Sequence, residues 1–307
     1  MIISLKGKKG QLFTILGIML IVLMFLSFDI YSSINDKKSI KTRVKTMDSF
    51  LKSMEKNMER YLIISGERII LIAEEKMING YYLADAQDFF NDTFFNDTED
   101  PASLMYGENF QDIVDSVNGQ ASKINVEVFL NNSQVNVSQD DPWHLKFSLK
   151  SDFILKDKQG LAQWNKTQHI DALIPIERFY DPILAYETRK LKNMTRTPYE
   201  GNYVSGSDYS NITIHVDNGY FAANPSAPSF LKRLEGDLSS DPNGIETFVN
   251  IPQLRALPPG IHVTDESKTI IDYIYFSSDD PQPITQVSAI HSWFKIDDGH
   301  KAKYNIT

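Results

Sequence analysis

The 307-residue chain contains no cysteine, which excludes disulfide bonds, thiolate catalysis and cysteine-ligated zinc. Its six histidines form no His-x-x-x-His or His-Glu-x-x-His pair, so the helical zinc signature is missing as well. A glycine-rich phosphate loop and a Gly-x-Ser-x-Gly nucleophile turn are also missing. From these absences we expect no catalytic residues, no metal site, no cofactor and no enzymatic activity.

Positive charge is scarce beyond the first 60 residues. The chain has a net charge of −9, to which residues 1–60 contribute +6 and the remaining 247 residues −15. An acidic domain repels a phosphate backbone, so we set nucleic acid aside as a partner. The basic N-terminal part suits a position beside anionic lipid headgroups.

Residues 12–28 form an uncharged apolar run of 17 residues. This length is near the lower limit for a helix that crosses a hydrocarbon core about 30 Å thick. Lys6, Lys8 and Lys9 precede the run and the acidic bulk follows it, which predicts an N-terminus inside and a C-terminus outside. We therefore expect a single-pass protein of the cell membrane, which contacts lipid through residues 12–28 and has an extracellular C-terminal domain.

Lys8, Lys9, Gly10 and Gln11 stand directly before this run. In this arrangement the N-terminus resembles the class III signal peptide of archaeal type IV pilin-like envelope proteins. The resemblance implies that a prepilin peptidase cuts between Gly10 and Gln11 and that the apolar helix stays on the mature protein. An ordinary secretory signal is instead cut after its apolar region, at small residues.

The resemblance divides the N-terminal part into a basic leader, residues 1–10, and a pilin-like transmembrane helix, residues 11–28. It also implies association with further copies of the chain or with other pilin-like subunits. Ile15 departs from the family pattern, because many type IV pilins have Glu at this fifth mature position. Two alternatives therefore stay open, an uncleaved signal anchor and an anchored protein that does not polymerise.

Residues 29–80 are predicted to form a helical stalk. They contain no proline, and Gly66 is the only glycine before Gly80. Apolar residues recur at intervals of three and four, which places them on one face of a helix. This stripe consists of Val44, Met47, Leu51, Met54, Met58 and Tyr61. Gly80 supplies a C-terminal stop.

Beyond the stalk we expect a connector, residues 81–121, with a short helical segment at 84–95. Residues 122–307 are expected to form a β-rich extracellular domain, because apolar and polar residues begin to alternate there. The predicted strands are 124–130, 135–138, 145–149, 153–155, 169–176, 212–216 and 270–276, and one helical turn is expected at 230–235. We predict turns at 131–133 and 157–160. The expected fold class is α+β: a long N-terminal membrane-spanning helix followed by an antiparallel β-rich ectodomain. Within this domain we expect a meander of four to six strands.

The sequence is rich in Asn-x-Ser/Thr triplets, the acceptors of N-glycosylation. Its composition of 20 Asn and 42 Ser plus Thr would give about 3 such triplets by chance, yet eight occur, all beyond the apolar run. The eight predicted glycosylation sites are Asn91, Asn96, Asn131, Asn136, Asn165, Asn193, Asn211 and Asn305. Asn224 is not an acceptor because Pro225 follows it. Since a glycan is bulky and polar, these asparagines should lie on the surface.

The histidines and tryptophans are interpreted as structural residues. His144 and His215 are expected to be ordinary strand residues, and His291 and His300 to lie near a solvated acidic turn at Asp297. The three tryptophans could form a platform that binds sugars, although core packing explains them more simply. These tryptophans are Trp143, Trp164 and Trp293.

The expected function is that of a membrane-anchored structural or interaction protein of the cell surface, a pilin-like subunit or a component of a surface filament. The alternative is an anchored adhesion module that binds a glycan or a protein without polymerising. An anchored hydrolase is the third hypothesis, and it would require His, Asp and Ser side chains that converge in a cleft.

Overall fold

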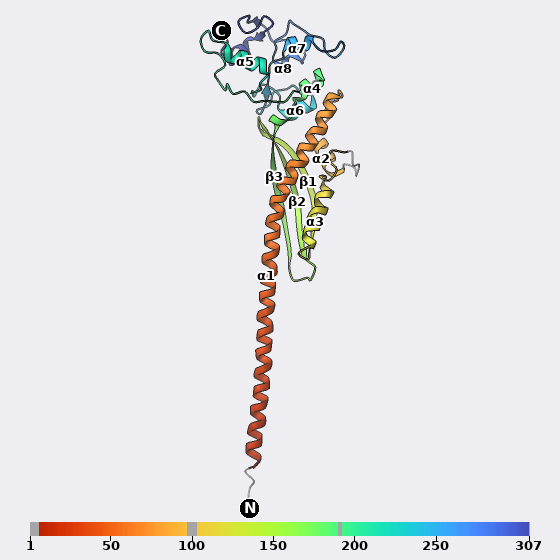
Figure 1. Cartoon of the computed structure of the whole chain (residues 1–307), viewed down its shortest axis with the longest axis vertical. Coiled ribbons are helices and arrows are strands. Elements are labelled where there is room, and N and C mark those ends of the chain that lie inside the picture. Colours follow the sequence, from red (N-terminus) through yellow and green to blue (C-terminus); the bar gives the residue numbers. More distant parts are fainter. Residues whose placement is uncertain (1–5, 97–102, 190–191, 307) are drawn as a thin grey trace, which may run out of the picture.

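The computed structural model describes residues 6–96, 103–189 and 192–306. The molecule is elongated, and its longest element, the helix α1 (Lys6–Ile78), projects from a folded body (Figure 1). The N-terminus lies at the free end of this helix, and the C-terminus lies at the opposite end of the molecule. The fold is α+β, with a long apolar N-terminal helix followed by antiparallel β-structure, as the sequence predicts.

α1 is one continuous helix of 73 residues, and the stripe predicted along it packs on the body. Met47, Met54 and Met58 are buried, while Val44 and Tyr61 at its edges are half-buried. The helix ends where the sequence predicts. The amide of Gly80 donates to the carbonyl of Met77 at 2.9 Å and that of Tyr81 to Lys76 at 3.0 Å, the paired bonds of a Schellman motif.

Gly66 marks a close approach of α1 to the sheet. A Cβ atom at this position would lie 2.3 Å from Cδ1 of Ile174 and 3.4 Å from a ring carbon of Phe147. A larger residue would therefore force the Ile174 side chain, or the helix itself, to move. The only glycine between residues 29 and 79 is therefore explained by packing.

The sheet beside α1 consists of β1 (Val126–Asp141), β2 (His144–Asp157) and β3 (Gln163–Pro175), antiparallel and in chain order. Its inner face is apolar, since Leu145, Phe147 and Leu149 of β2 are buried against the helices. The turn predicted at 157–160 joins β2 to β3, with the Gly160 amide bonded to the Asp157 carbonyl at 2.9 Å.

The hairpin predicted at 131–133 is wrong. The two predicted strands on either side of it are one strand, β1, which has an irregular register between Asn131 and Gln134. Asn132 does adopt a positive φ of 51°, the conformation that suggested a turn. In an antiparallel pair the same conformation inserts one extra residue as a bulge, and the chain continues in its original direction.

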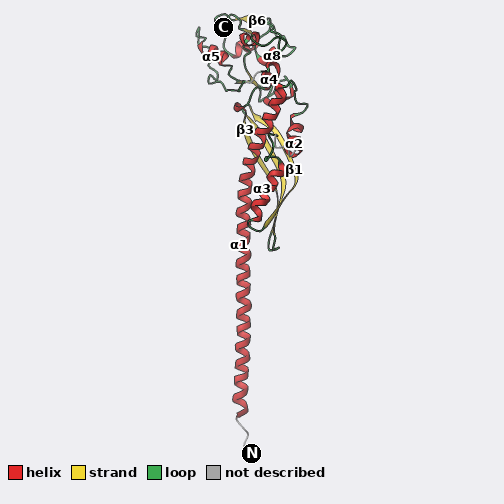
Figure 2. Cartoon of the chain, turned by 45° about the vertical axis from the view of Figure 1, so that its right-hand side comes forward, coloured by secondary structure: helices red, strands yellow, loops and turns green. Residues whose placement is uncertain are grey.

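The segment expected as a connector holds two helices, α2 (Ala86–Asn96) and α3 (Phe110–Ser122), which lie along the sheet near β1 (Figure 2). The helix predicted at 84–95 corresponds to α2. Phe90 and Phe94 of α2 pack on Phe147 of β2, with ring centroids 5.8 and 5.4 Å apart. α3 begins at a capping box in which the Asn109 side chain accepts from the amide of Asp112.

Side-chain amides from these two helices cover the outer edge of β1. Gln87 of α2 donates to the Val135 carbonyl at 2.9 Å and accepts from the Val137 amide at 2.8 Å. Asn118 of α3 accepts from the Val128 amide at 3.1 Å. A strand edge with its backbone groups paired in this way is no template for another chain.

Residues 176–306 form the end of the body farthest from the N-terminus (Figure 1). They contain short elements: η1 (Ile176–Arg178), α4 (Pro182–Thr188), α5 (Ser210–Asn218), β4 (Ala222–Ala223), α6 (Phe230–Glu235), β5 (Ile245–Glu246), α7 (Ile251–Arg255), α8 (Asp272–Tyr275), β6 (Ile284–Gln286), β7 (Lys295–Asp297) and α9 (Asp298–Lys303). The helical turn predicted at 230–235 is α6. This end has a second hydrophobic core of its own, which includes Phe248, Phe294 and Tyr304.

Two predicted strands in this end of the body are wrong. Residues 212–216 lie in the helix α5, where Ile212, His215 and Val216 share its buried face at helical spacing. Residues 270–276 contain α8, and Ile271 makes only an isolated bridge to Phe248. Instead of a meander of four to six strands, the large sheet has three strands among the described residues, and β4–β5 and β6–β7 pair separately.

Candidate functional site

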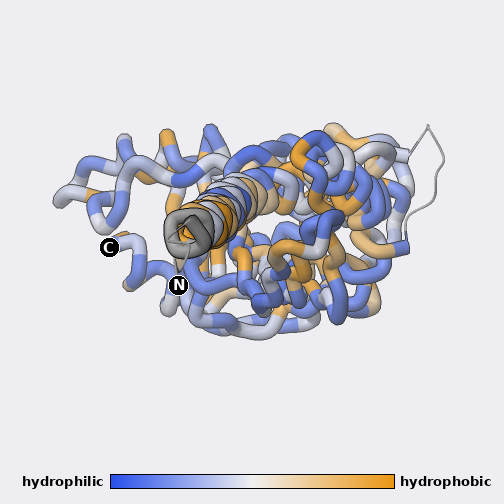
Figure 3. Tube along the Cα trace, turned by 90° about the horizontal axis from the view of Figure 1, so that it is seen from below, coloured by the Kyte–Doolittle hydropathy of each residue, from blue (hydrophilic) through white to orange (hydrophobic). Residues whose placement is uncertain are grey.

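The feature that distinguishes this molecule is the projecting part of α1, which points toward the viewer in Figure 3. Its large apolar side chains from Leu12 to Ile34 are each between 50% and 76% exposed. They lie on every face of the helix, and the described part of the body covers none of these faces. An exposed apolar surface of this extent is typical of a segment that contacts lipid or another protein.

The apolar run is long and apolar enough to cross a membrane by length and composition, and none of it is covered by the body. At 1.5 Å per residue, residues 12–28 span about 25 Å before the first charge, at Asp29. Gly10 and Gln11, the residues of the predicted cleavage site, lie in the helical backbone just before this run.

The body begins at Arg43, directly after the exposed part of α1. Its guanidinium donates to the carboxylate of Asp157 through Nε at 2.8 Å and to the carbonyl of Asn125 at 2.7 Å. Asp157 is buried, which opposes its ionisation, yet the bonds from Arg43 and from the Leu161 amide lower its pKa. This ion pair ties α1 to the end of β2 and fixes where the free part of the helix starts.

The predicted glycosylation sites lie at the surface. Six of these asparagines are exposed: Asn96, Asn131, Asn136, Asn165, Asn193 and Asn305. Asn91 and Asn211 are half-buried, and the amide of Asn211 donates to the Asn202 carbonyl at 3.0 Å. Thr98 and Thr307, which complete two of the triplets, lie outside the described residues. Asn224, which is not a glycosylation acceptor because Pro225 follows it, is instead buried and donates to Glu246.

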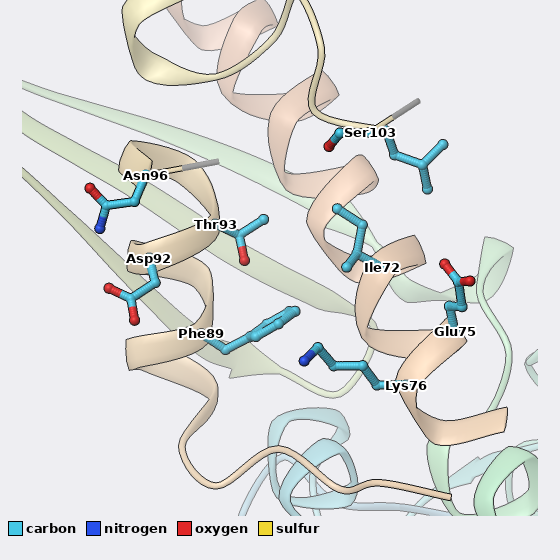
Figure 4. Close-up of a pocket in the computed structure, with 9 residues that line it drawn as sticks. Ile72, Glu75, Lys76, Phe89, Asp92, Thr93, Asn96 and Ser103 are labelled. Atoms are coloured by element: carbon cyan, nitrogen blue, oxygen red, sulfur yellow. The ribbon is translucent and has the colours of Figure 1, made fainter. Parts of the chain in front are cut away.

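A groove of about 610 Å³ lies between α1 and α2. Figure 4 shows that Phe89 and Thr93 of α2 point toward α1, whereas Asp92 and Asn96 point away from it. The ammonium of Lys76 lies over the Phe89 ring, 5.3 Å from its centroid. The groove is open and its lining is of mixed polarity.

The two hydrophobic cores meet at a fully buried ion cluster. Nη1 of Arg233 donates to Asp181 at 2.8 Å and to Asp272 at 2.7 Å, and its Nη2 donates to the Ile245 carbonyl. Burial raises the pKa of Asp272, against the pull of the Arg233 charge. The cluster connects α4, α6 and α8, so its geometry indicates a structural role.

A second polar cluster surrounds Glu246. This buried carboxylate accepts from Tyr304 at 2.7 Å and from Lys303, and Nε2 of His300 lies 3.2 Å away. Burial opposes the charge of Glu246, but His300 and Lys303 outweigh it and lower the pKa to about 2. Asp297 and Glu246 in turn raise the pKa of His300 to about 9, although burial opposes this.

Among the described residues, no group of three or more His, Asp or Glu side chains could hold a metal ion. The turn at Asp297 is not solvated as expected. Asp297 is buried, caps α9 and bonds His300 at 2.8 Å. His291 lies apart from these residues and pairs with Asp217 at 2.7 Å.

His215 is not a strand residue but a buried residue of α5. Its Nδ1 lies 3.0 Å from Thr197 Oγ1, while Nε2 has no hydrogen-bond partner within the described chain. Burial lowers its pKa to about 3, so the imidazole is neutral at ordinary pH. His144, by contrast, stands at the first position of β2, beside Asp141.

The three tryptophans do not share a surface. Trp143 is buried at the turn between β1 and β2, whereas Trp164 lies near the other end of the sheet, opposite Leu155. Trp293 stacks on His291 in the C-terminal end of the body, with ring centroids 4.9 Å apart. The structure therefore does not assemble the sugar platform that their number suggested.

No known relative identifies the chain: no family model, no curated protein and no solved structure matches it. The site must be interpreted from its own residues. Its strongest feature is the exposed apolar helix that continues, without a break, into the helix packed beneath the body.

Proposed function

We propose that the chain is a membrane-anchored structural or interaction protein of the cell surface, a pilin-like subunit or a component of a surface filament. The observation that supports this function is the exposed apolar run at the free end of α1. In this proposal residues 12–28 lie in lipid or in a filament core, and the body lies outside the cell. The surface asparagines then lie on the side where glycans are added.

Processing at Gly10 is the first test of this proposal. Intact-mass and N-terminal peptide spectrometry of protein from its native membrane should find a mature chain that starts at Gln11. Gly10→Val should retain the leader, whereas the matched variant Gly7→Val should still be processed. A wild-type chain that starts at Met1 would place the protein among uncleaved signal anchors.

The second test asks whether the chain associates through α1. Because the chain has no native cysteine, an introduced cysteine is its only thiol. Leu20→Cys introduces one thiol into the apolar run, and Val263→Cys introduces one on the body, where Val263 is 86% exposed. A filament or bundle built through α1 should yield oxidised dimers with Leu20→Cys and few with Val263→Cys. A Leu20→Cys protein that stays monomeric favours the alternative, an anchored adhesion module that does not polymerise. Ile15, in place of the Glu found in many pilins, supports that alternative.

A further inference from the structure

A pocket of about 240 Å³ lies in the C-terminal end of the body. It is formed by α4, the end of α5 and the segment that leads into α7. Leu184, Phe248 and Leu254 form the apolar part of its wall, and all three side chains are buried. The rest of the wall is polar: Asn218 and Gln253 add amide groups, and Asp217 adds an exposed carboxylate. Apolar walls combined with polar groups are the usual construction of a small-molecule site.

Lys192 places a positive charge in this pocket. No carboxylate lies within 4 Å of its ammonium and no hydrogen bond joins it within the described part of the chain. The acidic groups that act on it from farther away, Asp181 and Asp272, are both bonded to Arg233. Burial lowers the pKa of Lys192 in spite of these charges. A partly buried ammonium without a counter-ion is costly, and an anion would offset that cost.

The position of this ammonium depends on Gly219, the residue that follows α5. A Cβ atom on Gly219 would lie 1.6 Å from Nζ of Lys192, so a larger residue here would displace the ammonium from its present position. A lysine near a helix C-terminus often donates to the free carbonyls, but this ammonium makes no such bond within the described residues. The position of the Lys192 ammonium at the end of α5 therefore does not provide it with a hydrogen-bond acceptor.

We infer that this pocket binds a small organic carboxylate with an apolar body, whose anionic group pairs with Lys192 and whose body lies against Phe248 and Leu254. A charge-assisted bond between carboxylate and ammonium is stronger than a neutral one. The pocket volume suits a compact ligand such as an arylacetate. This inference goes beyond the proposed function and does not depend on it, because the pocket lies in the body and not on the projecting helix.

The test measures binding to the full chain in detergent micelles by calorimetry and by thermal shift. Phenylacetate should bind and raise the melting temperature, whereas phenylacetamide, of the same shape but uncharged, should not. Lys192→Met should weaken phenylacetate binding about tenfold or more, because it removes the charge-assisted bond. The matched control Lys301→Met, in α9 outside the pocket, should bind as the wild type does.

A measurement on the wild type keeps the test valid if Lys192→Met does not fold. Phenylacetate should protect Lys192, but not Lys301, from acetylation by acetic anhydride, as followed by peptide mass spectrometry.

The carboxylate could also be the C-terminus of a peptide. Tighter binding of acetyl-Gly-Gly-Phe than of phenylacetate would identify a peptide as the source, and tighter phenylacetate binding a free metabolite. If neither probe binds, or if phenylacetamide or Lys192→Met matches the wild-type result, the inference is overturned.

Discussion

Nε of Arg43 on α1 lies 2.8 Å from Oδ1 of Asp157, a residue 114 positions later at the end of β2. This pair joins the helix to the end of the sheet nearest the N-terminus. It divides α1 into a part that the body covers and a part that it leaves free.

Arg43→Met should loosen this attachment. The variant leaves the buried Asp157 carboxylate without its charged donor, so we expect the free energy of unfolding to fall by about 2 kcal/mol. Urea unfolding followed by circular dichroism measures the change. Lys52→Met is the control, because Lys52 pairs with Asp48 at the exposed surface and its loss should change the free energy of unfolding far less. Equal losses in the two variants would show that the Arg43 pair has no special role.

Arg233→Met should destabilise the body far more. It leaves Asp181 and Asp272 buried without a cation, and breaking a buried ion pair in this way costs about 3 to 5 kcal/mol. Replacing both carboxylates as well, with Asp181→Asn and Asp272→Asn, should recover part of the loss, since no buried charge then lacks a partner. Thermal unfolding compares the three proteins. A triple variant no more stable than Arg233→Met would contradict this account.

Glu74 should make stability depend on pH. It is buried on α1, where its Oε1 accepts from the Tyr180 amide at 2.5 Å, and burial raises its pKa to about 7 although that bond opposes the shift. A carboxyl whose pKa is higher in the folded than in the unfolded state stabilises the fold at low pH. This contribution is lost as the pH rises toward 7, and it amounts to roughly 2 to 3 kcal/mol between pH 5 and 8.

Glu74→Gln should remove this dependence while keeping an acceptor for the Tyr180 amide. Urea midpoints at pH 5 and pH 8 test the prediction in the wild type, in Glu74→Gln and in the control Glu67→Gln, whose carboxylate pairs with Arg178 at the surface. The comparison between variants is needed because His300, with its pKa raised to about 9, also loses stabilising charge as pH rises. Parallel pH profiles for Glu74→Gln and the wild type would refute the role assigned to Glu74.

The asparagines should differ in glycan content according to their exposure. Asn165→Gln removes an exposed acceptor and should lower the mass of the native protein by one glycan, with little effect on stability. Asn224→Gln should leave the glycan mass unchanged, and it should destabilise the fold because Asn224 bonds the buried Glu246. Mass spectrometry of protein from its native membrane measures the glycan mass of both variants. An unchanged mass in every variant of the eight asparagines would remove glycosylation from the proposed function.

The elements that could be predicted from the sequence are those with a long regular pattern. The stripe from Val44 to Tyr61 repeats over several helical turns, and the alternation in β1 to β3 runs for many residues. Residues 212–216 and 270–276 were misassigned because a short apolar run fits a buried helix as well as a strand. The hairpin at 131–133 was mispredicted for a related reason, because the positive φ of Asn132 occurs in a bulge as well as in a turn.

The buried ion cluster could not have been predicted. Arg233 is separated from Asp181 by 52 positions and from Asp272 by 39, and nothing distinguishes these three residues among 71 charged ones in the sequence. Only the fold brings them together. Lys192 is a similar case, because the place of its ammonium against Gly219, without an ion-pair partner among the described residues, has no sequence signature.

The continuity of α1 also has a mechanical consequence. No proline interrupts its 73 residues, and the backbone bonds run from the apolar end to the helix stop at Gly80. A pull or a twist applied to the body would travel along one hydrogen-bonded lever and would reach the apolar end without a hinge to absorb it. Whatever holds that end, lipid or neighbouring helices, bears the load directly.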